Sequence, residues 1–219
     1  MSNLRTGTFG DYYGSYYNES AALTQTQMKK NAGYVFSYFT YEGWTPNAIA
    51  AMLGNMQVES SINPGRWQSD NVGGGPAYGI VQWDPWSKYV DWCTEQGFSD
   101  PSEMDNNLAR IMYELENGGQ WYATDSYDLT FREFSTSTES PSYLAAAFVK
   151  NYERPADQSE SVLANRGSLA DAWYTYITGQ EPSDPSDPGG SSGSGSGSTK
   201  KRTKYKFVLF GKRRRILHG

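Results

Sequence analysis

The chain has 219 residues, with 19 Lys and Arg against 24 Asp and Glu, one Cys and one His. The single cysteine excludes an intramolecular disulfide and a zinc site built from several cysteines. The only histidine is the penultimate residue, His218, so the main body has none for a catalytic triad, a Cys/His nucleophile or a His-rich metal site. An enzyme made from this body must use carboxylate, hydroxyl, amine or tyrosine chemistry, and we expect no metal and no cofactor.

The net charge of -5 is the average of two unlike parts. Residues 200–219 hold nine basic residues, from Lys200 to Arg215, and no acid, so residues 1–199 carry a charge of -14. The sequence has no apolar run long enough for a membrane span, and its N-terminus lacks the basic start and apolar stretch of a secretory signal. We therefore expect a protein that acts inside its producing cell, or that leaves in a virus particle or after cell lysis.

The first 24 residues are rich in Tyr, Gly, Ser and Asn and show little apolar periodicity, which predicts a flexible arm over residues 1–24. Docking of its tyrosine cluster on a neighbouring surface is the alternative. From residue 26, apolar residues recur at helical spacing and predict a helix that ends near Gly43. Thr45 and Pro46 then supply an N-cap and a first-turn proline for a second helix that ends near Glu59.

Residues 63–78 are rich in Gly and Pro, which predicts a loop or a small irregular sheet region, and residues 79–83 look extended. Apolar spacing then predicts five more helices, over 86–96, 102–117, 130–136, 141–152 and 160–177. Residues 25–178 are therefore predicted to form one mainly α domain of the α+β kind, with a small irregular β insert. A Pro/Gly/Ser linker over 179–199 and a basic tail over 200–219 follow it.

The residues suited to chemistry lie around Glu59, at the C-terminal end of an apolar helix and directly before a polar loop. A carboxyl group there has apolar surface on its helix side and a cleft on its loop side. Desolvation disfavours the charged form, so such a glutamate keeps its proton to higher pH and can act as a general acid. Glycosidic bond cleavage needs such an acid and a second carboxylate. The alternative is an ordinary surface acid at a helix end.

Three segments carry a resemblance to a known family: GNMQVESSINPGRWQ at 54–68, YGIVQWDP at 78–85 and YERP at 152–155. Together they resemble the phage tail-associated lysozyme domains of tail-tip or tail-knob morphogenesis proteins from small phages that infect Gram-positive bacteria. The E-S pair at 59–60 and the G-x-x-Q segment at 79–82 are also similar to the pattern of goose-type lysozymes and lytic transglycosylases. The resemblance covers about residues 26–177. It implies the helical lysozyme fold with a small sheet beside the cleft, Glu59 as catalytic acid, and peptidoglycan as the substrate of a muramidase.

The second carboxylate is less clearly defined. Asp70 lies in the Gly-rich loop, where lysozymes of this superfamily often carry an assisting aspartate, and its alternative is an ordinary polar turn residue. Asp84 precedes Pro85 and is better suited to cap the following helix. If neither acts, the alternatives are a lytic transglycosylase, which needs one acid, or a non-catalytic module for wall binding or virion assembly with a lysozyme fold.

Several residues are candidates for substrate contact. By its superfamily position Gln82 is expected to bind an acetamido group or orient Glu59, and otherwise it holds its turn together. Tyr152 is expected to line the cleft near Glu59, whereas Glu153 and Arg154 suit a structural role. Sugar rings stack on aromatic faces, with core packing as the alternative for each aromatic candidate. These candidates are Trp67, Tyr78 and Trp83.

The basic tail from Lys200 to Arg215 suits an anionic wall polymer or a virion tail component, with a solvated extension that has no partner as the alternative. Nucleic acid is the weaker match, because a body with a charge of -14 repels phosphate. Taken with the resemblance, the expected location is the tail of a phage virion, or the bacterial cell wall after release.

Overall fold

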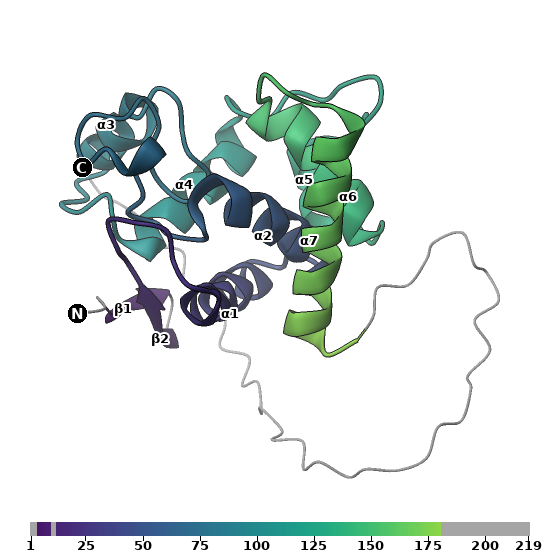
Figure 1. Cartoon of the computed structure of the whole chain (residues 1–219). Coiled ribbons are helices and arrows are strands. Elements are labelled where there is room, and N and C mark those ends of the chain that lie inside the picture. Colours follow the sequence, from purple (N-terminus) through teal and green to yellow (C-terminus); the bar gives the residue numbers. More distant parts are fainter. Residues whose placement is uncertain (1–3, 10–11, 181–219) are drawn as a thin grey trace, which may run out of the picture. The chain divides into compact units, whose positions relative to one another are not determined.

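The computed structural model describes residues 4–9 and 12–180. This part contains seven α-helices, two short helical turns and one β-hairpin (Figure 1). The helices are α1 (Gln25–Tyr41), α2 (Pro46–Ser60), α3 (Ser87–Glu95), α4 (Met104–Asn117), α5 (Phe131–Thr136), α6 (Pro141–Phe148) and α7 (Glu160–Thr178). The hairpin strands are β1 (Leu4–Phe9) and β2 (Tyr12–Tyr17), and the turns are η1 (Gln68–Asp70) and η2 (Val149–Glu153). The predicted basic tail, and all but the first two residues of the predicted linker, lie outside the described residues.

The mainly α fold and the seven helices predicted from apolar spacing are confirmed, six of them within two residues at each end. At the start of α2, the Thr45 side chain accepts a hydrogen bond from the Ala48 amide, and Pro46 occupies the first turn as predicted. The exception is the helix expected over 141–152. It ends as an α-helix at Phe148 and continues as the π-helical turn η2, so the residues of YERP begin in a widened turn.

Helix α2 is the centre of the core. Most of its residues are apolar and lie on all faces of the helix, and residues 48–53 are completely buried. It packs against α1 and against α6 and α7, and Figure 1 shows it between α1 and the α6–α7 pair. Gly54 permits the closest approach, because a Cβ atom there would lie 2.8 Å from the backbone nitrogen of Ala170 in α7. This crossing brings α7 against the C-terminal half of α2.

The N-terminal segment differs from the flexible arm that was predicted. Its strands pair antiparallel, with Leu4 opposite Tyr17. Arg5 Nη1 donates hydrogen bonds to Asp100 Oδ2 at 2.9 Å and to Glu103 Oε1 at 3.0 Å, and the buried Tyr16 hydroxyl donates to Glu103. The prediction of flexibility was wrong for residues 4–9 and 12–17, because polar side chains anchor the hairpin to the segment before α4. The alternative of a docked tyrosine cluster is closer to what is found.

Residues 63–86 form the irregular insert. Its β structure consists of isolated bridges that join Tyr78 to Trp67 and to Trp83. Residues 79–82 make a turn, closed by a hydrogen bond from the Gln82 amide to the Gly79 carbonyl at 3.1 Å, so the expectation of an extended segment was wrong. Within the described ranges, no helix has the length and apolarity needed to span a bilayer.

Candidate active site

Glu59 lies in the last turn of α2, and its side chain is 21% exposed. Arg166 of α7 donates a hydrogen bond from Nη2 to Glu59 Oε1 at 2.6 Å. The same guanidinium donates from Nη1 to the Asn55 carbonyl oxygen at 2.8 Å, and its side chain is only 7% exposed. Glu59 is therefore paired with a buried cation and not merely surrounded by apolar surface.

The E-S and G-x-x-Q segments form one hydrogen-bonded unit. Ser60 Oγ donates to the Ile80 carbonyl oxygen at 2.7 Å, and Asn107 Oδ1 accepts a bond from the Ile80 amide at 2.9 Å. Gly79 has a positive φ of 90°, and a Cβ atom there would lie 2.8 Å from the Trp83 ring. The spacing of the two segments thus has a physical reason, since they fix the loop against the helix end that carries Glu59.

A cleft of about 600 Å³ opens beside Glu59. Three parts of the chain line it: the end of α2, the irregular insert, and the segment that follows η2. Its lining residues are Val58, Glu59, Gln68, Ala77, Gln82, Asp84, Glu153, Arg154, Pro155 and Ala156. The cleft therefore has carboxyl groups on more than one wall, which is the group that glycosidic bond cleavage requires. Acidic, Cys and His side chains of the described ranges form no group of three suited to a metal ion.

Asp84 was predicted to cap the next helix, and that prediction is wrong. Helix α3 begins at Ser87 with Trp86 at the cap position and has no side-chain cap bond. The Asp84 residue lines the cleft instead.

Asp70, the predicted assisting carboxylate, lies in η1 outside the residues that line this cleft. Its Oδ1 is 3.0 Å from Arg66 Nε, and its side chain is 45% exposed. Gln68, two residues earlier, does line the cleft. Asp70 is thus fixed beside the rim of the cleft while Glu59 lies within it, and its assignment stays a prediction.

Gln82 lines the cleft as expected, but its amide nitrogen is used within the loop. Nε2 donates to the Arg66 carbonyl oxygen at 3.0 Å and to the Gly79 carbonyl oxygen at 2.8 Å. These bonds fit the alternative in which Gln82 holds its turn together, and they fix its position in the cleft wall.

Most of the predicted aromatic contacts belong to the core. Tyr78, Trp83 and Tyr152 are 5%, 1% and 1% exposed, so they offer no ring face to a sugar, and the expectation that Tyr152 lines the cleft was wrong. Trp67 is partly exposed and lies edge to face with Trp86 at 5.8 Å between ring centroids. Among these candidates, Trp67 alone is partly exposed in the described structure.

Glu114 of α4 explains why two of these aromatic residues are buried. The carboxylate is 2% exposed and accepts hydrogen bonds from Trp83 Nε1 at 3.0 Å, from Arg110 Nε at 2.8 Å and from the Tyr152 hydroxyl. Burial raises the pKa of Glu114, although the three donors act to lower it. Trp83 is next in sequence to cleft residues of the insert, and Tyr152 is next to Glu153 on the opposite wall. The buried Glu114 carboxylate, which binds both, therefore connects these two walls on their core side.

Glu153, at the end of η2, is a cleft residue that the sequence suggested only as part of a structural pair. Burial, and after it the charge of Glu59, raises the pKa of Glu153 well above its ordinary value. Arg154 does not pair with it, because Nη1 of Arg154 donates to the carbonyl oxygens of Gln120 at 2.6 Å and Asn151 at 2.7 Å.

Arg166 was missed altogether. A sequence signal existed, because Arg166, Ala170 and Trp173 lie on one buried face of α7 at helical spacing. A cation on a buried face implies a buried anionic partner. Nothing local in the sequence says which carboxylate that partner is.

Comparison with known proteins identifies the family of this chain. The phage tail lysozyme family profile matches residues 30–177. The chain is also similar to Morphogenesis protein 1 of Bacillus phage B103, with 41% identity over 166 residues. The aligned part covers 75% of this chain and 44% of that relative, so the chain spans less than half of the relative's length. On this match the chain belongs to the phage tail lysozyme family.

Proposed function

We propose that the chain is a muramidase that cleaves the β-1,4 glycosidic bonds of peptidoglycan, with Glu59 as the general acid. The observation that carries this proposal is the position of Glu59 at a helix end, inside a cleft of about 600 Å³ that other carboxyl groups also line. Membership of the phage tail lysozyme family supports the same substrate class. The leaving oxygen must receive a proton as its bond to the sugar breaks, and a positioned carboxyl group supplies it.

Other residues take supporting roles in this proposal. Asp70 assists as the second carboxylate from the rim of the cleft, held in place by Arg66. Gln82 contacts an acetamido group with its carbonyl oxygen, since its nitrogen is engaged within the loop. Trp67, which is partly exposed and precedes the cleft residue Gln68, offers the exposed part of its ring to a sugar.

A lytic transglycosylase is the second candidate, and the exposed position of Asp70 outside the cleft lining favours it. Such an enzyme uses one acid and closes the sugar on itself, so it needs no carboxylate to activate water. Mass spectrometry of released muropeptides separates the two reactions. Reducing ends support the muramidase, and 1,6-anhydro ends support the transglycosylase.

The main test is Glu59→Gln, measured as clearing of Gram-positive cell walls in a zymogram and as release of soluble muropeptides. Loss of the acid is expected to reduce the rate by about 100-fold or more. Glu95→Gln, at an exposed position in α3, is the matched control and should keep full activity. Equal clearing by wild type and Glu59→Gln overturns the assignment of Glu59. No clearing by any of the three proteins favours a non-catalytic wall-binding or assembly module.

Asp70 needs its own test. Asp70→Asn preserves shape and removes the charge, so a helper role predicts a loss of about 10-fold or more with the fold unchanged. Val72→Asn, at an exposed position in the same loop, controls for disturbance of the loop itself. Activity of Asp70→Asn equal to that of the control removes Asp70 from the mechanism.

We further propose that the chain is a component of a virion tail and degrades the wall locally. The named relative is a phage morphogenesis protein, which supports virion association. In this proposal the basic segment from Lys200 to Arg215, outside the described residues, adds attraction to an anionic wall polymer. Deletion after Thr199 should then weaken binding to intact walls at low salt while activity on soluble glycan fragments persists. Unchanged wall binding contradicts this role of the tail.

A further inference from the structure

The guanidinium of Arg166 ties the proposed acid to the backbone of the helix that carries it. Nη2 donates to Glu59 Oε1 at 2.6 Å, and Nη1 donates to the Asn55 carbonyl oxygen at 2.8 Å. Asn55 and Glu59 lie one turn apart in α2, so one guanidinium can reach both. Because its donors form a planar and rigid fork, the two bonds fix each other's direction. Arg166 therefore holds the Glu59 side chain in one position relative to α2.

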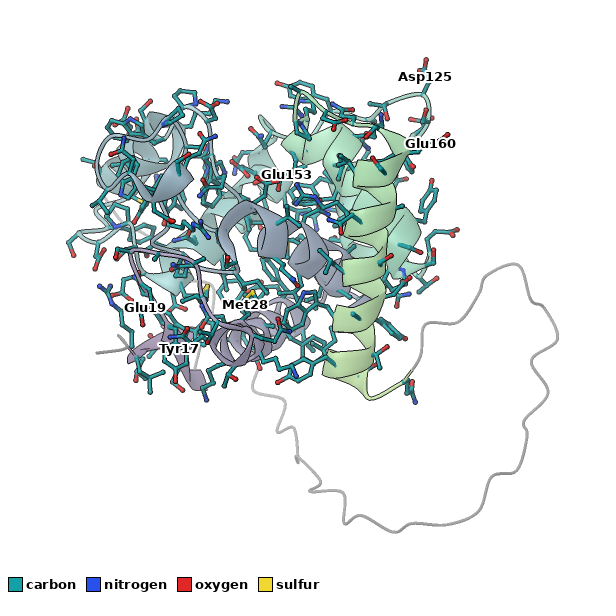
Figure 2. The ribbon with its side chains drawn as sticks, in the orientation of Figure 1. Tyr17, Glu19, Met28, Asp125, Glu153 and Glu160 are labelled. Carbon is teal, nitrogen blue, oxygen red and sulfur yellow. The ribbon has the colours of Figure 1, made fainter. Side chains whose placement is uncertain are left out.

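Arg166 is itself held by the close packing of α7, whose start is labelled at Glu160 in Figure 2, against α2. A Cβ atom on Gly54 would lie 2.9 Å from the Arg166 carbonyl oxygen, so the two helices approach closely at this point. Further along α7, Trp173 Nε1 donates to Gln57 Oε1 at 2.8 Å. The Arg166 side chain is only 7% exposed, and close packing leaves it little room for another rotamer. The guanidinium thus has a fixed place against the end of α2.

The guanidinium reaches Glu59 from the side away from the cleft. Glu59 lines the cleft, whereas Arg166 is buried and is not among the described residues that line it. Within the described ranges, the Glu59 side chain has one hydrogen bond, and that bond is at Oε1. Oε1 is therefore engaged on the core side, and Oε2 is the oxygen that remains for a ligand in the cleft.

The same contact decides which oxygen of Glu59 can carry the acid proton. A guanidinium has N–H donors and no acceptor, so a proton on Oε1 would face another hydrogen atom. A protonated carboxyl group keeps acceptor capacity on its second oxygen, so Oε1 can accept from Nη2 whether or not Oε2 carries a proton. The bond to Arg166 can therefore persist while a proton on Oε2 leaves and returns.

We infer that Arg166 is a positioning residue, which fixes Glu59 with Oε2 towards the substrate and assigns the transferable proton to that oxygen. Glu59 gives this proton to the glycosidic oxygen as the C1–O bond breaks. Water then adds its hydroxyl group to C1, and the remaining proton of that water restores the acid. Arg166 touches no reacting atom; it orients the proton donor, and a small displacement of such a group has a large effect on rate. The inference rests on the proposed role of Glu59 as general acid.

The first test measures kcat and KM of Arg166→Lys on soluble glycan fragments. The ammonium group keeps the charge, but it cannot bridge Asn55 and Glu59 with a planar fork. We expect kcat to fall about tenfold or more while KM stays within about threefold, because Arg166 orients the acid and does not line the cleft. Arg132→Lys, at an exposed position in α5, is the matched control and should keep both values. A wild-type kcat overturns the inference, as does a loss that lies only in KM.

Chemical rescue separates positioning from a general need for a well-packed core. Free guanidinium, at concentrations well below those that unfold the protein, should enter the site vacated in Arg166→Ala and raise kcat by about fivefold or more. Sodium chloride at the same ionic strength should not raise it, because Na⁺ has no N–H donors. Failure of guanidinium to raise kcat of a folded Arg166→Ala protein overturns the inference.

The third test uses the intact chain and does not depend on activity. In a structure of wild type with a bound oligomer of N-acetylglucosamine, Oε2 should be the Glu59 oxygen nearest to the glycan, with Arg166 Nη2 still on Oε1. Contact of the glycan with Oε1, or a Glu59 side chain that has left Arg166, overturns the inference. The expected arrangement in a chain that cleaves no glycan leaves the positioning intact and refutes the proposed activity, so the two failures are distinguishable.

Discussion

Arg166 Nη2 lies 2.6 Å from Glu59 Oε1, and this contact joins α7 to the last turn of α2. Because the Arg166 side chain is 7% exposed, removal of either partner leaves a poorly solvated charge. We expect Arg166→Met to lower the free energy of unfolding by about 2 to 3 kcal/mol. A double-mutant cycle with Glu59→Gln, measured by denaturant unfolding, should give a coupling energy above about 1 kcal/mol. A coupling close to zero shows that the contact does not contribute to stability.

Gly54 tests the helix crossing that positions Arg166. A Cβ atom there would lie 2.8 Å from Ala170 N and 2.9 Å from the Arg166 carbonyl oxygen, both of them backbone atoms. Gly54→Ala should therefore destabilise the fold by about 1 to 3 kcal/mol, although alanine is the better helix former. The matched control is Gly33→Ala in α1, where a Cβ atom meets nothing within 4 Å and stability should rise by up to about 1 kcal/mol. Thermal unfolding of both variants measures the difference in stability. An equal gain in stability at both positions contradicts the close approach of α2 and α7 at Gly54.

Glu114 tests the link behind the cleft. Glu114→Leu removes the acceptor shared by Trp83, Arg110 and Tyr152 and leaves three donors in a buried site. The free energy of unfolding should fall by about 3 to 5 kcal/mol, and activity should fall with it because both cleft walls lose their support. Glu95→Leu, at an exposed position, should change stability by less than about 0.5 kcal/mol. Denaturant midpoints and glycan cleavage are the measurements. Unchanged activity in a folded Glu114→Leu protein would show that these hydrogen bonds do not support the cleft walls.

The hairpin anchor should depend on pH. Burial acts to raise the pKa of Asp100, but hydrogen bonds from Ser102 and Arg5 outweigh it, and the pKa lies below its ordinary value of 3.8. The ionised form is therefore favoured by folding, so its contribution is present above the ordinary value and is lost as pH falls through the lowered one. Asp100 is partly exposed, so Asp100→Asn should cost only about 0.5 to 1 kcal/mol at neutral pH. That difference should vanish in acid, whereas Asp91→Asn, at an exposed position in α3, should change the free energy of unfolding by less than about 0.5 kcal/mol at neutral pH.

The helices were predictable because their signals are local. Thr45 and Pro46 mark the start of α2 with groups that act within one turn, and apolar spacing marks the buried faces. The hairpin was not predicted because the hydrogen-bond partners of Arg5 and Tyr16 lie about ninety residues away in the sequence, and no local pattern indicates them. The polar side chains of the hairpin are held in place by tertiary contacts, which amino-acid composition does not reveal.

For the site, the quoted segments located Glu59 and Gln82 in the cleft. The aromatic assignments failed for Trp83, because an indole with its N–H satisfied by a buried carboxylate packs as a core residue. Arg166 could not be assigned to Glu59 from sequence, since a buried cation on α7 does not name its anion. The environment of a catalytic carboxyl group is set by its three-dimensional neighbours more than by its flanking residues.

The contact between Arg166 and Glu59 spans 107 positions of the chain and so has a consequence for synthesis. Domains form progressively as the polypeptide leaves the ribosome, with N-terminal parts first. Helix α2 can emerge and pack against α1 early, but its glutamate has no cation until α7 has also cleared the exit tunnel. A chain terminated before Arg166 would carry every quoted lysozyme segment and still lack a finished site, so wall-degrading capacity is expected only when translation of the whole domain is complete.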